Sequence, residues 1–128
     1  LDPSTGMYLV DGSGLSRKNL VSPEFFCDFL TAMLDSPVCE PFVESLPQPG
    51  KSSQVGRMRA EDPAAAARVL YKSGSMEGVR CYSGYVIPTD GSKEDIIVFS
   101  VMVNNYTGPT WKIMGEIDRI IALIAKEN

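Results

Sequence analysis

A lysine, two hydroxyls and a glycine stand together at Lys72-Ser73-Gly74-Ser75, directly after the apolar run Val69-Leu70-Tyr71. A lysine ammonium and a serine hydroxyl can jointly hold a carboxylate, because one supplies charge and the other a hydrogen bond. Gly74 lets a ligand backbone approach the strand, and the Ser75 N–H can face a developing oxyanion. The tripeptide is a weak signal by itself, and an exposed lysine at a strand end is the alternative interpretation.

A second polar cluster runs from Asp11 to Arg17, with the sequence Asp-Gly-Ser-Gly-Leu-Ser-Arg. Two glycines, two hydroxyls and an acid this close together predict a tight loop held by local side-chain hydrogen bonds. An arginine held by such a loop is suited to clamp an anion. The sequence leaves open whether this is a structural turn alone or an anion site at Arg17.

The chain of 128 residues contains no histidine, which excludes several kinds of active site from it. Ser-His-Asp triads, Cys–His pairs and histidine metal ligands all need that residue. The three cysteines, Cys27, Cys39 and Cys81, show no C-x-x-C spacing, so we expect no metal and no cofactor. Cys27 and Cys39 either pair in an oxidising compartment or stay free thiols.

The overall composition is that of one globular domain, with 44% hydrophobic residues and a net charge of −4. A negative charge argues against a nucleic-acid partner, because proteins that bind nucleic acid gather positive charge. No apolar run reaches the ~18 residues of a transmembrane helix. Since the sequence begins at Leu1 without a methionine, we expect a processed product or an excised fragment.

Helical periodicity predicts two main helices. Ser22 and Pro23 are typical of a helix start, and apolar residues recur at helical spacing over roughly 23–35. The second helix is predicted from about 110 to 126. Its core stripe is expected to be Ile113, Ile117, Ile120 and Ile124, flanked by Met114 and Ile121. Between the two helices, residues 47–62 are predicted to form a long loop, a feature that is often functional in a compact domain.

Three stretches predict strands: the run into Lys72–Ser75, then 79–87, then 96–103. The third is almost continuously apolar, which is typical of a strand that is covered on both faces. The order of helix, three antiparallel strands and helix predicts an α+β fold with the helices packed on the sheet.

Several strings in this chain resemble the C-terminal part of the class C low-molecular-mass penicillin-binding proteins. These are the D-alanyl-D-alanine carboxypeptidase/endopeptidases of peptidoglycan maturation. The resemblance extends over nearly the whole chain. The strings are, in order, Asp11 to Arg17 with Asn19, Leu46-Pro47, Lys72 to Ser75, Ser83 to Val86 and Phe99 to Asn105.

The resemblance implies a serine acyl-transfer enzyme with the motifs Ser-x-x-Lys, Ser-x-Asn and Lys-Thr-Gly, in which a lysine replaces histidine as the base. It implies that Lys72 and Ser73 orient the substrate's terminal carboxylate and that Ser75 gives one oxyanion N–H. Arg17 would line the site, and Glu77 stands where the family often has glutamine. The implied substrate is a peptidoglycan stem peptide ending in D-Ala-D-Ala. The implied location is the periplasm or extracytoplasmic bacterial cell envelope, where β-lactams would bind the intact parent.

Two of the three family motifs are missing from this chain. No serine stands three residues before a lysine or two residues before an asparagine. Both motifs precede the Asp-Gly-Ser-Gly loop in the family, so residues 1–128 are interpreted as the C-terminal portion of a transpeptidase-like domain. We expect such a portion to be inactive alone, and either to self-associate or to be marginally stable. A catalytically inactive peptide- or glycan-binding module of the same fold and a class A β-lactamase are the alternatives.

Overall fold

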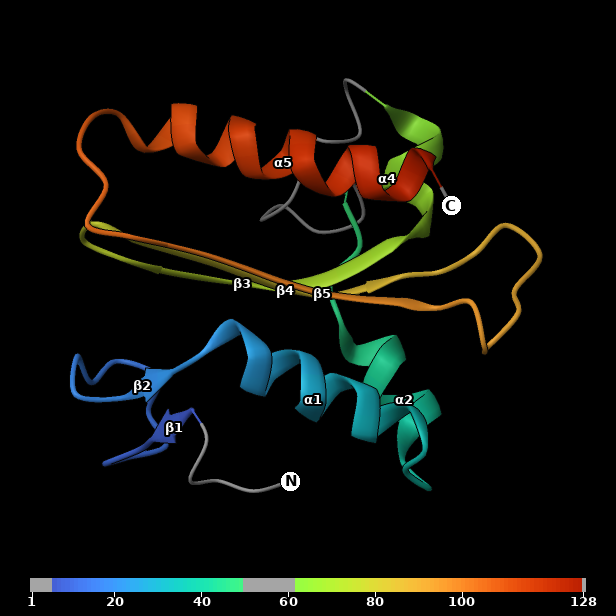
Figure 1. The fold of residues 1–128 in the computed structure, drawn as a ribbon, viewed down its shortest axis with the longest axis horizontal. Coiled ribbons are helices and arrows are strands. Elements are labelled where there is room, and N and C mark those ends of the chain that lie inside the picture. The colour runs from blue at the N-terminus through green and yellow to red at the C-terminus, as the bar shows by residue number, and fades with distance from the viewer. Residues whose placement is uncertain (1–5, 50–61, 128) are drawn as a thin grey trace.

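A three-stranded antiparallel sheet lies between two layers of helices in the computed structural model, which describes residues 6–49 and 62–127 (Figure 1). One layer contains α1 and α2, and the other contains α4 and α5. This arrangement confirms the predicted α+β class. The elements are β1 (Met7–Tyr8), β2 (Leu20–Val21), α1 (Pro23–Leu34), α2 (Cys39–Ser45), α4 (Pro63–Arg68), β3 (Val69–Met76), β4 (Val79–Val86), β5 (Ile97–Asn104) and α5 (Thr110–Lys126).

The first helix begins and ends where the sequence predicts. The Ser22 hydroxyl accepts a hydrogen bond from the Phe25 N–H at 3.1 Å, and Pro23 occupies the first turn, where its missing N–H costs nothing. The helix ends at Leu34, three residues before Pro37. None of the described helices is long and apolar enough to cross a membrane.

Strand β4 is the centre of the sheet, with β3 on one side and β5 on the other. Its pairing with β3 runs without interruption from Val69↔Val86 to Met76↔Val79, and its pairing with β5 is equally regular. The Tyr85 hydroxyl donates a 2.8 Å hydrogen bond to the Leu30 carbonyl oxygen, which ties β4 to α1. Burial raises the pKa of Tyr85 to about 12, so this phenol stays a donor at neutral pH.

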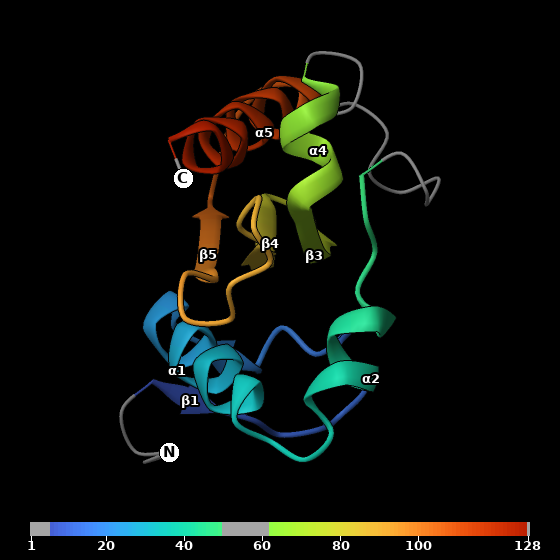
Figure 2. The same ribbon diagram turned by 90° about the vertical axis from the view of Figure 1, so that its right-hand side faces the viewer.

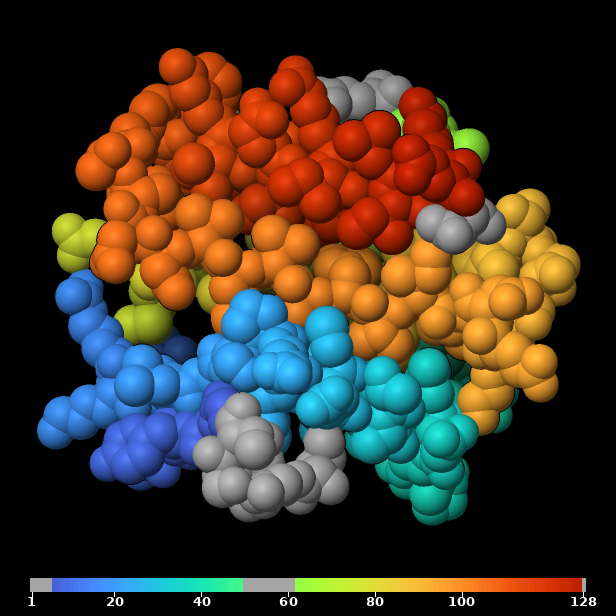
Figure 3. Space-filling model, viewed as in Figure 1, coloured from blue at the N-terminus to red at the C-terminus, as the bar shows by residue number. Residues whose placement is uncertain are grey.

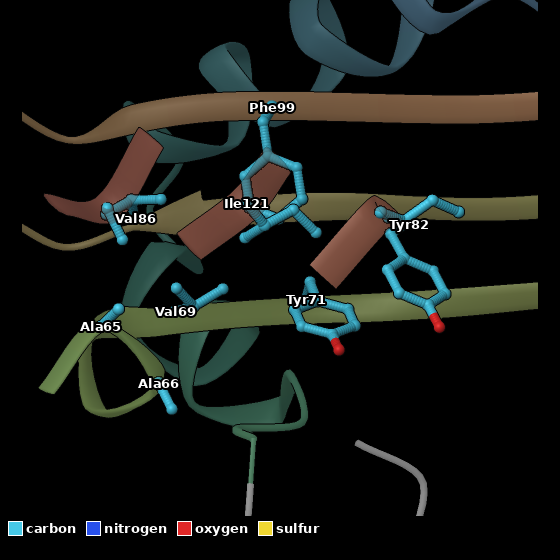
Figure 4. Close-up of a cluster of buried hydrophobic side chains, with 10 residues drawn as sticks. Ala65, Ala66, Val69, Tyr71, Tyr82, Val86, Phe99 and Ile121 are labelled. Atoms are coloured by element: carbon cyan, nitrogen blue, oxygen red, sulfur yellow. The ribbon is translucent and has the colours of Figure 1, made fainter. Parts of the chain in front are cut away.

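The main hydrophobic core lies on the opposite face of the sheet, beneath α5 (Figure 4). Tyr71 stacks on Tyr82 with 4.9 Å between ring centroids and meets Phe99 edge-on at 6.2 Å. Burial and the neighbouring carboxylate of Asp118 both raise the pKa of Tyr71. The buried residues of this core are Ala65, Ala66, Val69, Tyr71, Tyr82, Val86, Phe99, Ile117, Ile121 and Ala125.

The buried stripe of α5 differs from the predicted one. Ile117, Ile121 and Ala125 are buried, whereas Ile120 is 46% exposed, so the prediction that Ile120 belongs to the core is wrong. The cause is α4, which packs against α5 and lays Ala65 and Ala66 in the same core. With a helix on one flank as well as a sheet beneath, the buried face of α5 turns toward α4.

Three further outcomes concern the loops and thiols. The short antiparallel pair β1–β2, with Met7 opposite Val21, was not predicted, because two residues are too few to show a period. Cys27, Cys39 and Cys81 are free thiols, so no disulfide joins the first two. Most of the predicted loop 47–62 lies outside the described residues.

Gly84 is required for the close approach of β3 to β4. A Cβ atom added to Gly84 would lie 2.0 Å from the Leu70 carbonyl oxygen and 2.6 Å from the Tyr71 Cα. Both contacts are with backbone or core, so neither can move without disturbing the sheet. We expect Gly84→Ala to lower the free energy of unfolding by about 1–3 kcal/mol in urea denaturation.

The matched control is Gly115→Ala in α5, where an added Cβ meets nothing within 4 Å. Alanine favours the helix over glycine, so this variant should gain about 0.5–1 kcal/mol. A Gly84→Ala protein as stable as the wild type would show that the sheet does not depend on this contact.

Candidate active site

The stretch Lys72–Ser75 lies on β3, the strand at one edge of the sheet. The Tyr71 N–H points away from β4, because it donates to the Pro47 carbonyl oxygen at 3.0 Å. Backbone N–H groups of a strand alternate between its two edges, so those of Ser73 and Ser75 point to the same outer edge. Among the described residues, no backbone group bonds this edge beyond Tyr71. The predicted oxyanion donor at Ser75 therefore faces outward.

Lys72 begins a row of polar side chains that crosses the sheet. It stands opposite Ser83 on β4, which in turn stands opposite Ser100 on β5. The two serine hydroxyls are 2.9 Å apart and hydrogen-bonded. This row lies on the face toward α1, because Tyr85, two residues after Ser83, bonds to α1. The exposed Lys72 ammonium donates to the Ser73 carbonyl oxygen at 2.5 Å.

The side chains of Lys72 and Ser73 leave β3 on opposite faces, since neighbouring residues of a strand alternate. Ser73 stands opposite Tyr82, which belongs to the core under α5. A carboxylate that binds both side chains must therefore lie beside the outer edge of β3 rather than over either face. The backbone geometry thus places any shared ligand next to the outward N–H groups.

The loop from Asp11 to Asn19 is held by its own side chains. The Asp11 carboxylate accepts hydrogen bonds from the Ser13 N–H at 3.0 Å and the Ser13 hydroxyl at 2.9 Å. The Asn19 side-chain oxygen accepts from the Val10 N–H at 2.9 Å. Gly14 has a φ of +72°, a conformation that side chains with a Cβ rarely adopt. The polar residues of this loop thus hold the turn by their own hydrogen bonds, as predicted from the sequence.

Arg17 is the side chain that this loop presents to the sheet. Its Nη2 atom lies 3.0 Å from Oε2 of Glu77, the residue that directly follows β3. Both side chains are exposed to solvent, so the pair is open to a ligand and to screening by salt. Arg17 and Glu77 were predicted separately, and the structure brings them together at the far end of the strand that carries Lys72.

The two cations of the candidate site are well separated. Glu77 follows Lys72 by five positions along an extended strand, so their backbones are about 17 Å apart. One carboxylate cannot contact both Lys72 and the Arg17–Glu77 pair. An extended ligand along the outer edge of β3 can approach both ends.

Sequence reasoning did not identify the hydroxyl pair of Ser83 and Ser100 as part of this site. A signal was present, because Ser100 is the single polar residue between Ile97 and Val103. A hydroxyl in an otherwise apolar strand needs a hydrogen-bond partner when it is covered. Which partner it finds depends on the register of β4 against β5.

Residues 3–123 match the D-Ala-D-Ala carboxypeptidase 3 (S13) family. The chain belongs to this family. It is 37% identical over 112 residues to the D-alanyl-D-alanine carboxypeptidase of Actinomadura sp. (strain R39). The aligned region covers 83% of this chain and 20% of that protein. It is 31% identical over 128 residues to the penicillin-sensitive carboxypeptidase A of Dictyostelium discoideum, covering 95% of this chain and 24% of that protein.

The fold is similar to that of solved penicillin-binding proteins. The crystal structure of penicillin binding protein 4 (dacB) from Haemophilus influenzae superimposes with a TM-score of 0.75 at 24% identity. The superposition covers 96% of this chain and 27% of the penicillin binding protein 4 chain. A second structure of the same protein, complexed with a novel β-lactam, gives a TM-score of 0.74 at 25% identity. The chain thus spans about a quarter of these relatives.

The hydrogen bonds to Asp11 make a prediction about pH. The Ser13 hydroxyl, and then the Ser13 N–H, hold the pKa of this carboxyl below its ordinary value of 3.8. A lowered pKa means that the ordered loop favours the ionised carboxylate. The stability that this carboxylate gives the loop is therefore complete above pH 3.8, and it is lost as the pH falls through the lowered pKa. The Ser13 amide resonance should therefore titrate with a midpoint below 3.8, measured by NMR.

The control for this titration is Asp11→Asn, in which the transition of the Ser13 amide should disappear. A midpoint at or above 3.8 in the wild-type chain would contradict the observed hydrogen bonds as the main influence on this carboxyl.

Proposed function

We propose that this chain is the C-terminal portion of the transpeptidase-like domain of a serine-type D-Ala-D-Ala carboxypeptidase. The observation that carries the proposal is the Lys72–Ser75 stretch on the outer edge of β3, where no described strand pairs with it, in a chain of the S13 family. The proposed substrate is a peptidoglycan stem peptide that ends in D-Ala-D-Ala.

In this proposal the Lys72 ammonium and the Ser73 hydroxyl hold the terminal carboxylate of the peptide at the edge of β3. Charge and a hydrogen bond from the two faces of the strand fix its position. The outward N–H of Ser75 then supports the negative charge that develops on the attacked carbonyl oxygen. Gly74 keeps the edge free of a side chain, so the peptide backbone can lie close to it.

Arg17 and Glu77 line the distal end of the same edge. Their distance from Lys72 assigns them to a part of the substrate beyond the terminal D-Ala. The Glu77 carboxylate is paired with the Arg17 guanidinium. A substrate group that binds Arg17 therefore competes with this carboxylate or bridges the two side chains.

The nucleophile and its base come from outside this chain in our proposal. No lysine here has a serine three residues before it, and no asparagine has one two residues before it. A serine enzyme of this type needs both motifs for acylation. The 128 residues would thus bind the substrate carboxylate but not attack the peptide bond.

The cell-wall substrate implies action in the periplasm or extracytoplasmic cell envelope. The parent protein would also bind β-lactams, and the β-lactam complex of the Haemophilus influenzae relative supports this. The absence of the two motifs also favours a second candidate, a catalytically inactive peptide- or glycan-binding module. A Ser-x-x-Lys and a Ser-x-Asn motif upstream in the parent polypeptide would decide for the enzyme.

The carboxylate role of Lys72 is tested by titrating the chain with acetyl-D-Ala-D-Ala. The amide resonances of Ser73 and Ser75 should shift on binding, and Lys72→Ala should weaken the affinity at least tenfold, because a charged hydrogen bond contributes about 1.5–3 kcal/mol. The matched control is Lys112→Ala on α5, a helix that lies over the face of the sheet opposite to Lys72. Equal affinity in both variants would overturn the role of Lys72.

The position of the nucleophile is tested with a labelled penicillin. The isolated chain should form no adduct that survives boiling in detergent, because it contains no activated serine. A stoichiometric adduct would place the nucleophile within these 128 residues and contradict the proposal.

A further inference from the structure

The Arg80 guanidinium has a buried N–H group that the described residues do not use. Arg80 is the second residue of β4, and its Nε atom is buried without a hydrogen-bond partner among the described residues. None of the ion pairs between described residues includes Arg80. A buried N–H donor without an acceptor costs free energy, so we expect this group to have a partner that the described part of the chain does not supply.

Arg80 lies on the face of the sheet that α5 covers. Tyr82 belongs to the core beneath α5 (Figure 4), and residues two positions apart on a strand share a face. The register places Arg80 directly opposite Ser75 of β3, the predicted oxyanion donor. Side chains that stand opposite one another in an antiparallel pair share a face, with Cβ atoms about 4.5–5.5 Å apart. Arg80, Ser75 and Ser73 therefore lie on one face of the sheet.

Only β3 separates Arg80 from the outer edge at which the substrate is proposed to bind. Figure 2 shows β3, β4 and β5 side by side, with β3 at one edge. Neighbouring strands are about 4.8 Å apart, a spacing that an extended arginine side chain can cross. The β3 residues at this point are small, namely Ser73, Gly74 and Ser75. Arg80 is half-buried, and in Figure 3 the olive atoms of the β3–β4 turn reach the surface at the left of the molecule. A ligand at this end of the edge can thus meet the guanidinium.

The carboxylate that follows this site in the sequence is already paired. Glu77 stands two positions after Ser75, and its Oε2 atom lies 3.0 Å from Nη2 of Arg17. A planar guanidinium matches a carboxylate through two parallel hydrogen bonds. The chemistry of Arg80 therefore suits a carboxylate that comes from a ligand.

The carboxylate that is proposed to bind Lys72 and Ser73 lies within reach of Arg80. The Lys72 side chain leaves β3 on the α1 face, so its ammonium approaches the edge from that side. On the α5 side, Ser73 offers a hydroxyl but no charge. Arg80 supplies a cation on the side where Lys72 does not.

We propose that Arg80 is a further substrate-binding residue, whose guanidinium holds the terminal carboxylate of the peptide from the α5 side of the β3 edge. Lys72 holds the same carboxylate from the α1 side, and the Ser73 hydroxyl bonds to it beside Arg80. The ligand is a peptide with a free C-terminal carboxylate. This inference rests on the proposed function, because it concerns the same substrate group. It adds that two cations, one on each face of the edge strand, select a charged terminus over a neutral one.

The first test compares acetyl-D-Ala-D-Ala with its C-terminal amide in NMR titrations of the chain. Arg80→Gln should weaken binding of the acid about tenfold, because a charge-assisted hydrogen bond is lost, and should leave the weaker binding of the amide unchanged. The matched control is Arg119→Gln, which removes the same charge from an exposed site on α5, where Arg119 pairs with Glu116. An equal loss for acid and amide would show a merely structural role and would overturn the proposal. Full affinity of Arg80→Gln for the acid would also overturn it.

The second test uses the wild-type chain and does not depend on the folding of a variant. The Arg80 Nε–H resonance should move when the chain is titrated with acetyl-D-Ala-D-Ala and should stay in place with the amide. An unmoved Nε–H resonance, at acid concentrations that shift the Ser73 and Ser75 amides, would overturn the role of Arg80.

The outcomes separate this inference from the proposed function. If Lys72→Ala weakens binding of the acid and Arg80→Gln does not, the role of Arg80 is overturned and the proposed function stands. If Arg80→Gln weakens binding and Lys72→Ala does not, the role of Lys72 is overturned and that of Arg80 stands. If the acid moves neither the Ser73 and Ser75 amides nor the Arg80 Nε–H, both are overturned.

Discussion

The register of β3 against β4 is the constraint on which the rest of this structure depends. It places Tyr71 in the core and Lys72 on the opposite face, beside the row that contains Ser83 and Ser100. A shift of one residue would exchange the two side chains and put an ammonium among aromatic rings. Burial of Tyr71 against Tyr82 and Phe99 makes that shift costly, and the missing side chain of Gly84 makes the observed pairing possible. The core therefore positions the polar edge.

The two edge strands of the sheet differ in composition. Strand β3 carries the polar stretch Lys72–Ser75, with Arg17 near its far end, and in our proposal this edge binds an anionic peptide. The other edge strand, β5, is apolar except for Ser100 and Asn104. The helices α1 and α5 cover the two faces of the sheet and leave the edges.

The local elements of this fold could be predicted because their signals are local. The Ser22-Pro23 start of α1, the apolar periodicity of α5 and the three strands all reflect contacts within a few residues or a simple period. Errors arose where distant segments decide. Ile120 was predicted to be buried, but the packing of α4 turns it outward, and the β1–β2 pair joins Met7 to Val21 and Tyr8 to Leu20, far apart in the chain. Neither effect leaves a trace in a short sequence window.

The amino-acid sequence by itself determined the α+β class, the strand that carries Lys72–Ser75 and the Asp11–Arg17 loop with its internal hydrogen bonds. It also excluded any catalytic or metal-binding role for histidine in this chain. These follow from residue types and their spacing. Only the tertiary structure decided that Arg17 meets Glu77, that Ser83 and Ser100 bond beside Lys72, and that the side chains of Lys72 and Ser73 lie on opposite faces of the edge strand β3. Such relations depend on strand register and on which edges stay unpaired. Register and edge pairing are set by the burial of side chains far apart in the chain, and a linear sequence does not display that burial.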